Sequence, residues 1–301
     1  MIEAASGCPE YDREWQLTLA ASEAGRLRDA LVHCSAALAA ARCAGLSDLV
    51  DRTRCAEATI AIELGEAASP LPGLREILVR NGNAENCSRA ARVIARAYEL
   101  TKDYRKSLFY ARVARDRAEE AHSPERLGVA YNQMGNALLG QSLFGEAADS
   151  FRQALGRIPA SQIEWRLICT ANLAYCGLLE GRLREGLRSL YRVLREARRH
   201  RLTRLEMIAR VDLCYAYLEL DRLREAERCG RRGLALAEWV GEQTGIKNAM
   251  YLLGQVAVLQ GEEERARDHF GALQRRFYPG QNHLADFLVS VDVRPLINLR
   301  A

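Results

Sequence analysis

Apolar and polar residues follow one another along this chain with the period of amphipathic helices. Apolar pairs four positions apart, which share one side of an α-helix, recur along it: Leu17 and Ala21, Ile94 and Tyr98, Met134 and Leu138, Leu213 and Tyr217, and Leu253 and Ala257. Each pair is followed by a polar turn and then by a second pattern of the same period, such as Phe270 and Leu273. The pattern predicts antiparallel helix pairs along most of the chain.

The predicted turns share a short motif that begins with a turn residue and closes five positions later with a small residue. It occurs at 25–30, 102–107, 142–147, 181–186, 221–226 and 261–266. The closing residues Ser107, Ala147, Gly186, Ala226 and Ala266 follow one another at intervals of 40, 39, 40 and 40 residues. Such a fixed interval is typical of repeat architectures.

One repeat unit is degraded. Ala30 and Ser107 are 77 residues apart, close to two periods, so a unit without the motif lies between them. We expect its second helix to begin near Pro70 and Gly73 and to contain Leu74 and Ile77.

The units resemble the tetratricopeptide repeat. The best match reads Tyr131, Met134, Gly135 and Leu138, followed by Phe144, Ala147, Phe151, Ala154 and Pro159. The period is near 40 residues instead of the family's usual 34, and helical hairpins of another repeat family are the alternative. The resemblance spans about residues 10–278. It implies an all-α fold, a right-handed α-solenoid of about seven antiparallel helix hairpins, whose first helices line the concave side of a superhelix.

Small residues follow the apolar anchors of the first helices, at Ala95, Gly135, Ala174, Cys214 and Gly254. A small side chain lets a neighbouring helix approach closely, so we expect helix contacts at these positions.

We divide the chain into a repeat domain, residues 1–280, and a C-terminal part, residues 281–301. Residues 283–291 predict a short capping helix over the last hairpin. The apolar tail after it, broken by Pro295, either folds back on the repeats or docks onto a second copy. We favour folding back.

Composition limits the classes of function. The chain has 49% apolar and 27% charged residues and a net charge of +4, enough to form a core and a solvated surface. We expect no secretory signal in the first ten residues and no membrane-spanning segment. Nine cysteines without a C-x-x-C pair favour a reducing, cytoplasmic location.

Catalysis is not expected. The five histidines are scattered, and no glycine-rich phosphate loop, G-x-S-x-G or H-E-x-x-H motif occurs. Cys169 and Cys176, seven residues apart, are read as core packing. We therefore predict a protein that is not an enzyme and that uses no metal and no cofactor.

A binding groove is predicted on the first helices, at positions that commonly hold ligand in tetratricopeptide proteins. Asn and Gln can bracket a main-chain amide, Tyr gives broad contact, and Arg can fork onto a carboxylate. The alternative is a solvated polar face. The candidate residues are Arg92, Arg96, Asn132, Asn136, Asn172, Tyr175, Asp212, Tyr215, Tyr251 and Gln255.

A basic region is a second candidate binding surface. Residues 181–232 contain fifteen arginines and eight acids, a local charge of +7, so the rest of the chain carries −3. A possible docking patch for an acidic protein comprises Arg195, Arg198, Arg199, Arg201 and Arg204. Complementing the helix dipole is the favoured explanation, and nucleic acid the least favoured, because we expect no aromatic stacking surface beside the arginines.

The sequence thus predicts a cytoplasmic scaffold or adaptor that binds a protein or peptide segment in a concave groove, an acidic segment being one candidate. A regulatory sensor resembling the tetratricopeptide receptors of signalling peptides is the alternative, and an RNA-binding repeat is a weaker one. Homo-oligomerisation through the C-terminal tail is a further possibility.

Overall fold

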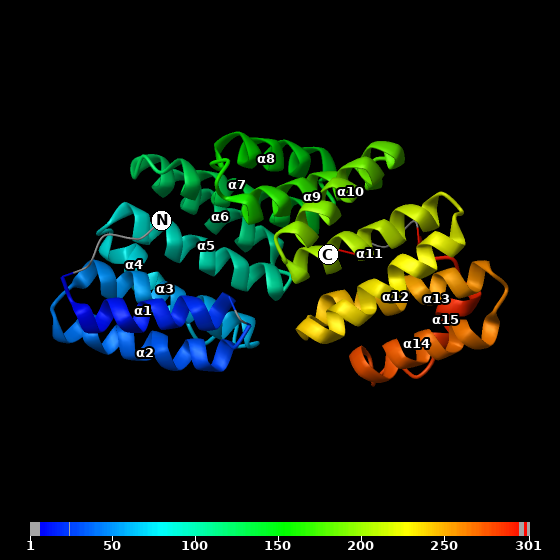
Figure 1. The fold of residues 1–301 in the computed structure, drawn as a ribbon, viewed down its shortest axis with the longest axis horizontal. Coiled ribbons are helices and arrows are strands. Elements are labelled where there is room, and N and C mark those ends of the chain that lie inside the picture. The colour runs from blue at the N-terminus through cyan, green and yellow to red at the C-terminus, as the bar shows by residue number, and fades with distance from the viewer. Residues whose placement is uncertain (1–6, 24, 295–297, 300–301) are drawn as a thin grey trace. The chain divides into compact units, whose positions relative to one another are not determined.

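The computed structural model describes residues 7–23, 25–294 and 298–299. Within them the chain forms fifteen helices and no strand (Figure 1). The helices are α1 Pro9–Glu23, α2 Leu27–Cys43, α3 Ser47–Glu63, α4 Leu71–Arg80, α5 Ala84–Leu100, α6 Tyr104–Glu120, α7 Pro124–Gly140, α8 Phe144–Arg157, α9 Ile163–Leu179, α10 Leu183–Arg199, α11 Thr203–Glu219, α12 Leu223–Val240, α13 Gln243–Leu259, α14 Glu263–Phe277 and α15 Leu284–Ser290. The predicted all-α fold class is confirmed.

The helices form two compact units. The first holds α1–α7, and the second holds α9–α15 with most of α8. Inside each unit, a helix packs against the next one along the chain, as α5 does against α6 and α11 against α12. First helices of successive pairs also touch: α5 contacts α3 and α7, and α11 contacts α9 and α13. This is the stacked-hairpin arrangement that the repeat predicts.

Two predictions about individual helices, the degraded repeat unit and the C-terminal capping helix, are confirmed. The degraded unit is present as α3 and α4, and α4 buries Leu74 and Ile77 at 1% exposure each. The expected capping helix is α15, which packs against α14 and α13 and buries Leu288.

A left-handed residue ends the first helix of six pairs. The first residue of every turn motif has a positive φ: Gly25, Lys102, Ser142, Gly181, Asp221 and Gly261 lie between 56° and 79°. After the α5 turn the amide of Asp103 donates to the carbonyl of Tyr98 at 2.9 Å, and that of Lys102 to Glu99 at 3.0 Å. These two bonds satisfy carbonyls that the helix leaves free, which is the Schellman pattern. The motif therefore specifies the reversal between paired helices.

Close helix approach occurs at Gly254 on α13. A Cβ atom there would lie 2.3 Å from Cε1 of Phe270, whose ring on α14 is fully buried. On α11 the equivalent position is Cys214, and the glycine lies on the neighbouring helix α12 instead. A Cβ atom on Gly230 would lie 3.0 Å from the Cys214 sulfur. The expectation of small residues at helix contacts is confirmed at this position.

Candidate functional site

A polar ladder runs across the first helices of the second unit. An amide or carboxylate side chain stands three positions before a tyrosine on α9, α11 and α13, and these helices contact one another in order. The Tyr175 and Tyr215 ring centroids are 6.0 Å apart. The ladder consists of Asn172 and Tyr175, Asp212 and Tyr215, and Asn248 and Tyr251.

The C-terminal segment, residues 292–301, lies on this ladder in its described part. The Leu299 amide donates to the Tyr175 hydroxyl at 3.0 Å, and the Asn248 side-chain amide donates to the Leu299 carbonyl at 2.9 Å. Both main-chain polar groups of Leu299 are thus bound, by side chains from two different helices. The Leu299 side chain is itself buried, with 5% exposed. These contacts agree with the tail folding back on its own chain.

Asp292 and Arg294 shape the start of the segment. The Arg294 guanidinium donates to both carboxylate oxygens of Asp292, at 2.9 and 2.7 Å, and its main-chain amide donates at 3.0 Å. The side-chain hydrogen bond from Arg294 lowers the pKa of Asp292 below its ordinary range. Arg294 also attracts Glu219 of α11. The segment is therefore held to the ladder by the main-chain hydrogen bonds of Leu299, while Asp292 and Arg294 pair with each other at its start.

Five of the six ladder residues are buried, and Tyr215 is partly exposed. Tyr175 has 0% of its surface exposed, and Asp212 and Gln255 have 2% each. Burial, with a smaller contribution from Glu219, raises the pKa of Tyr215 to about 12. Burial likewise raises that of Tyr251. The face that the sequence suggests as free for a guest is occupied by the chain itself around Tyr175.

The candidate residues of the first unit lie on α5 and α7 and form a different environment. Arg96 forms an ion pair with Glu99. Burial lowers the pKa of Arg92. Burial, with repulsion from Arg89, lowers the pKa of Arg126 to about 10. Asn132 is buried and Asn136 is partly buried. Helices α5 and α7 therefore carry positive charges that are partly removed from water.

The predicted basic patch lies around the end of α10 and the start of α11. Arg198 pairs with Glu206 at 3.0 Å, and Glu196 pairs with Arg195 at 3.1 Å and with Arg199 at 3.7 Å. Arg201 adopts a left-handed conformation in the turn, and Arg204 is exposed. Three of the five arginines thus have acidic partners at the surface, where such pairs contribute little.

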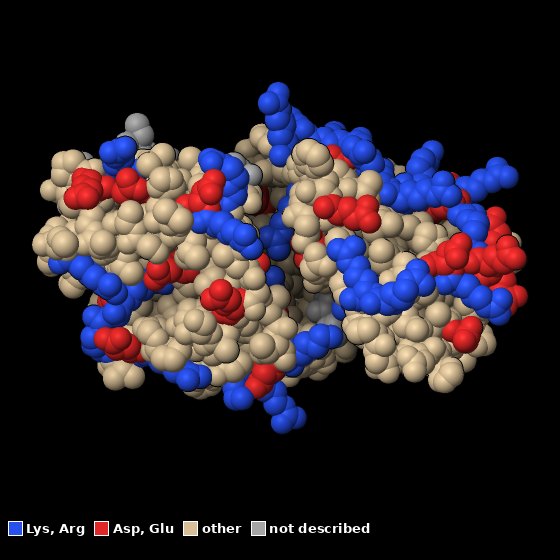
Figure 2. Space-filling view, turned by 90° about the horizontal axis from the view of Figure 1, so that it is seen from below, with Lys and Arg blue, Asp and Glu red and all other residues tan. Residues whose placement is uncertain are grey.

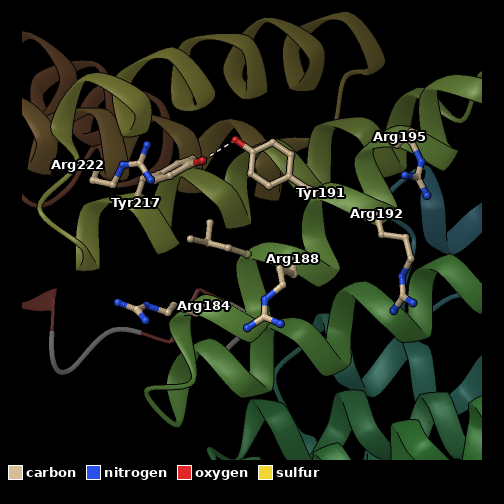
Figure 3. A pocket seen from close by; sticks show the side chains of 8 residues that line it. Arg184, Arg188, Tyr191, Arg192, Arg195, Tyr217 and Arg222 are labelled. Atoms are coloured by element: carbon tan, nitrogen blue, oxygen red, sulfur yellow. Dashed lines mark hydrogen bonds between the residues drawn. The ribbon is translucent and has the colours of Figure 1, made fainter.

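Sequence reasoning missed Asn248, although the signal was present. Asn172 and Asp212 precede their tyrosines by three residues, and Asn248 precedes Tyr251 by the same interval. It noted the arginine-rich stretch but placed the docking patch at Arg195 and beyond, and so did not select Arg184, Arg188 and Arg192 earlier on α10 (Figure 3).

The described residues contain neither a cluster of metal ligands nor a membrane-spanning helix. No three His, Cys, Asp or Glu side chains among them gather as metal ligands would. None of the described helices combines the length and apolar character needed to cross a membrane.

Comparison with known proteins adds evidence on the fold alone. No sequence profile of a known family matches the chain, and no curated protein matches it by sequence. Solved structures do match. A tetratricopeptide repeat protein from Parabacteroides merdae is 17% identical, with 93% of this chain and 98% of that one aligned and a TM-score of 0.55.

Two further matches were solved as complexes. NprR bound to its cognate peptide NprX is 13% identical, with 96% of this chain and 83% of that one covered and a TM-score of 0.69. A Rap protein bound to competence and sporulation factor is also 13% identical, with 95% and 77% covered and a TM-score of 0.68. The chain has the helical-repeat fold of these tetratricopeptide-type structures.

Proposed function

We propose that this chain is a non-catalytic scaffold that binds an extended polypeptide segment on the first helices of its second unit. The observation that carries the proposal is the pair of hydrogen bonds to the main chain of Leu299, one from Asn248 and one to Tyr175. An arrangement that binds both polar groups of one main-chain residue is suited to other polypeptide segments as well.

The chemistry of the ladder supports main-chain recognition. An asparagine side chain carries a donor and an acceptor together, and a tyrosine adds a hydroxyl to a broad apolar face at low entropic cost. Two such pairs, on α9 and α13, flank the pair of Asp212 and Tyr215 on α11, whose carboxylate only accepts hydrogen bonds, and together they offer repeated contacts along an extended guest. Neighbouring side chains of the guest then determine which sequence binds best.

A regulatory sensor is the second candidate, and the C-terminal segment favours it. A guest that binds at Tyr175 and Asn248 has to displace Leu299, so binding is coupled to release of Leu299 from these two side chains. The similarly folded NprR and Rap proteins were solved with a peptide and with competence and sporulation factor, respectively. A scaffold and a sensor share the groove, and they differ in whether release of the segment changes another interaction.

The test uses the full-length chain and a labelled synthetic peptide of residues 291–301. Leu299→Asp places a charge at a buried position and should free the segment. Val291→Asp is the matched control, because Val291 is 42% exposed. In fluorescence anisotropy we expect the peptide to bind the Leu299→Asp protein at least about tenfold more tightly than wild type or the control.

Asn248→Ala in the Leu299→Asp background should lower that affinity about fivefold, the size of one lost hydrogen bond. Equal, weak binding by all four proteins, with circular dichroism showing intact helices, would contradict the proposal.

A further inference from the structure

A second surface lies on α10, a second helix of the same unit. Arg184, Arg188, Arg192 and Arg195 line a shallow groove with Leu187 and Tyr191 of the same helix. Tyr217 of α11 and Arg222, the N-cap residue of α12, complete it (Figure 3). The groove uses none of the residues that contact the C-terminal segment, so it is independent of the proposed function.

The spacing of the arginines defines a regular row. Arg184, Arg188 and Arg192 are four residues apart, which places them on one side of α10 at about 6 Å intervals. Like charges at this spacing destabilise an isolated helix by a few tenths of a kcal/mol per pair. The row therefore opposes helix stability, and a partner that neutralises it would relieve the repulsion.

These three arginines are the ones in the groove without acidic partners. Arg195 pairs with Glu196 at 3.1 Å, and Arg222 pairs with Glu225. No described residue forms an ion pair with Arg184, Arg188 or Arg192, and all three are exposed. The row can therefore take anionic groups without first breaking contacts within the chain.

The floor beside the row is aromatic. Tyr191 is 45% exposed, and its hydroxyl lies 2.5 Å from that of Tyr217, so that one of them donates to the other (Figure 3). The Arg222 guanidinium stacks over the Tyr217 ring at 4.8 Å. One exposed aromatic ring, that of Tyr191, therefore accompanies the arginines, where the sequence led us to expect no aromatic stacking surface. A guest meets cations along one side and the exposed Tyr191 ring along the other.

We propose that this groove docks an acidic helical segment of a partner protein, with carboxylates repeated every fourth residue. Such a helix places its carboxylates at the same 6 Å interval as the arginines, and each guanidinium can fork onto one of them. Leucine-sized side chains beside the carboxylates would cover Leu187 and Tyr191. The partner is thus defined by charge complementarity and by a shared helical repeat.

Nucleic acid fits this surface less well. Single-stranded binding relies on several aromatic rings that stack successive bases, whereas Tyr191 is the exposed ring among the lining residues. On the face of the molecule drawn in Figure 2, acidic side chains lie among the basic ones. The observations favour a protein partner.

The test uses the full-length chain and a labelled synthetic helical peptide with glutamate at every fourth position and leucine beside each glutamate. Arg188→Ala with Arg192→Ala should weaken binding in fluorescence anisotropy at least tenfold, since it removes two charge-assisted contacts. The matched control is Arg228→Ala with Arg232→Ala, which removes the same charge at the same spacing from α12. We expect the control to change affinity less than threefold.

Three outcomes would overturn the proposal. Equal losses in the two double variants would reduce the effect to net charge. No measurable binding by wild type would remove the site. Stronger binding of a 16-nucleotide oligothymidine, abolished by the α10 variant alone, would make the groove a nucleic-acid surface.

Discussion

The main-chain amide of Leu299 donates a hydrogen bond to the hydroxyl of Tyr175, which precedes it by 124 residues, at 3.0 Å. Tyr175 is fully buried, so the bond forms away from water. Buried polar groups nearly always have a partner, because leaving one unsatisfied costs about 1–3 kcal/mol.

Tyr175→Phe should therefore loosen the C-terminal segment. The change keeps the ring and removes the acceptor of the Leu299 amide. We expect hydrogen exchange of residues 292–301 to accelerate about tenfold, equivalent to about 1.4 kcal/mol, while exchange in α9 stays near wild type. Tyr98→Phe, which removes a hydroxyl bonded to Arg75 in the first unit, is the control. Unchanged exchange in the Tyr175 variant would show that the hydroxyl does not hold the segment.

Gly254→Ala should destabilise the second unit. The added Cβ would lie 2.3 Å from the fully buried Phe270 ring, and overpacking of this kind costs about 1–3 kcal/mol. Gly73→Ala on α4 is the control, because no atom lies within 4 Å of its Cβ position and alanine favours a helix. Urea denaturation should show a lower midpoint for the first variant and an equal or higher one for the second. Similar midpoints would mean that α13 and α14 do not approach closely.

Thiol labelling should separate the nine cysteines by burial. Cys43 is exposed and Cys8 is partly exposed, whereas the other seven are buried. Thiolates, not thiols, react with disulfide reagents, and burial raises the pKa of Cys34, Cys55 and Cys169 to about 12. At pH 8 we expect one fast thiol, absent from Cys43→Ser, then a slower one, with the rest released only on unfolding. Rapid reaction of several thiols in folded protein would contradict the packing.

Because these thiols are buried, we expect the free energy of unfolding to fall in alkali. Their folded pKa of about 12 lies above the ordinary value of 9.0. Below pH 9 both states keep the protons and the contribution is fully present. Between pH 9 and about 12 the unfolded chain ionises first, so the free energy of unfolding falls.

Urea denaturation at pH 8 and at pH 10.5 measures this loss. We expect a smaller loss between the two pH values in the triple variant Cys34→Ala, Cys55→Ala and Cys169→Ala. Its absolute stability is lower because of the cavities, so the pH dependence is the quantity to compare. An unchanged pH dependence would assign the effect to other groups.

The fold was predictable because its information is local. Each turn motif specifies a left-handed residue and the start of the next helix within six positions, and apolar periodicity identifies the faces that pack. The chain uses Lys102, Ser142 and Asp221 where Gly25, Gly181 and Gly261 stand in other units. Spacing identified these turns although residue type alone did not.

The site was less predictable because it depends on contacts across distant parts of the chain. Asn248 follows a rule already visible at Asn172 and Asp212, so it could have been found. The contacts of Leu299 with Tyr175 and Asn248 could not have been found, because neither residue type nor spacing determines where the C-terminal segment binds. Likewise, the groove on α10 needs Tyr217 from the next helix beside Tyr191, a neighbour that no single-helix pattern contains.

The covalent link between the groove and the segment that occupies it changes how affinities are measured. A short tether holds its end at an effective concentration of the order of millimolar. A free peptide at micromolar concentration must bind about a thousandfold more tightly than the segment to displace half of it. The apparent affinity measured with intact protein will therefore be much weaker than the affinity of the unoccupied groove. Only a tight-binding or abundant ligand will give detectable binding.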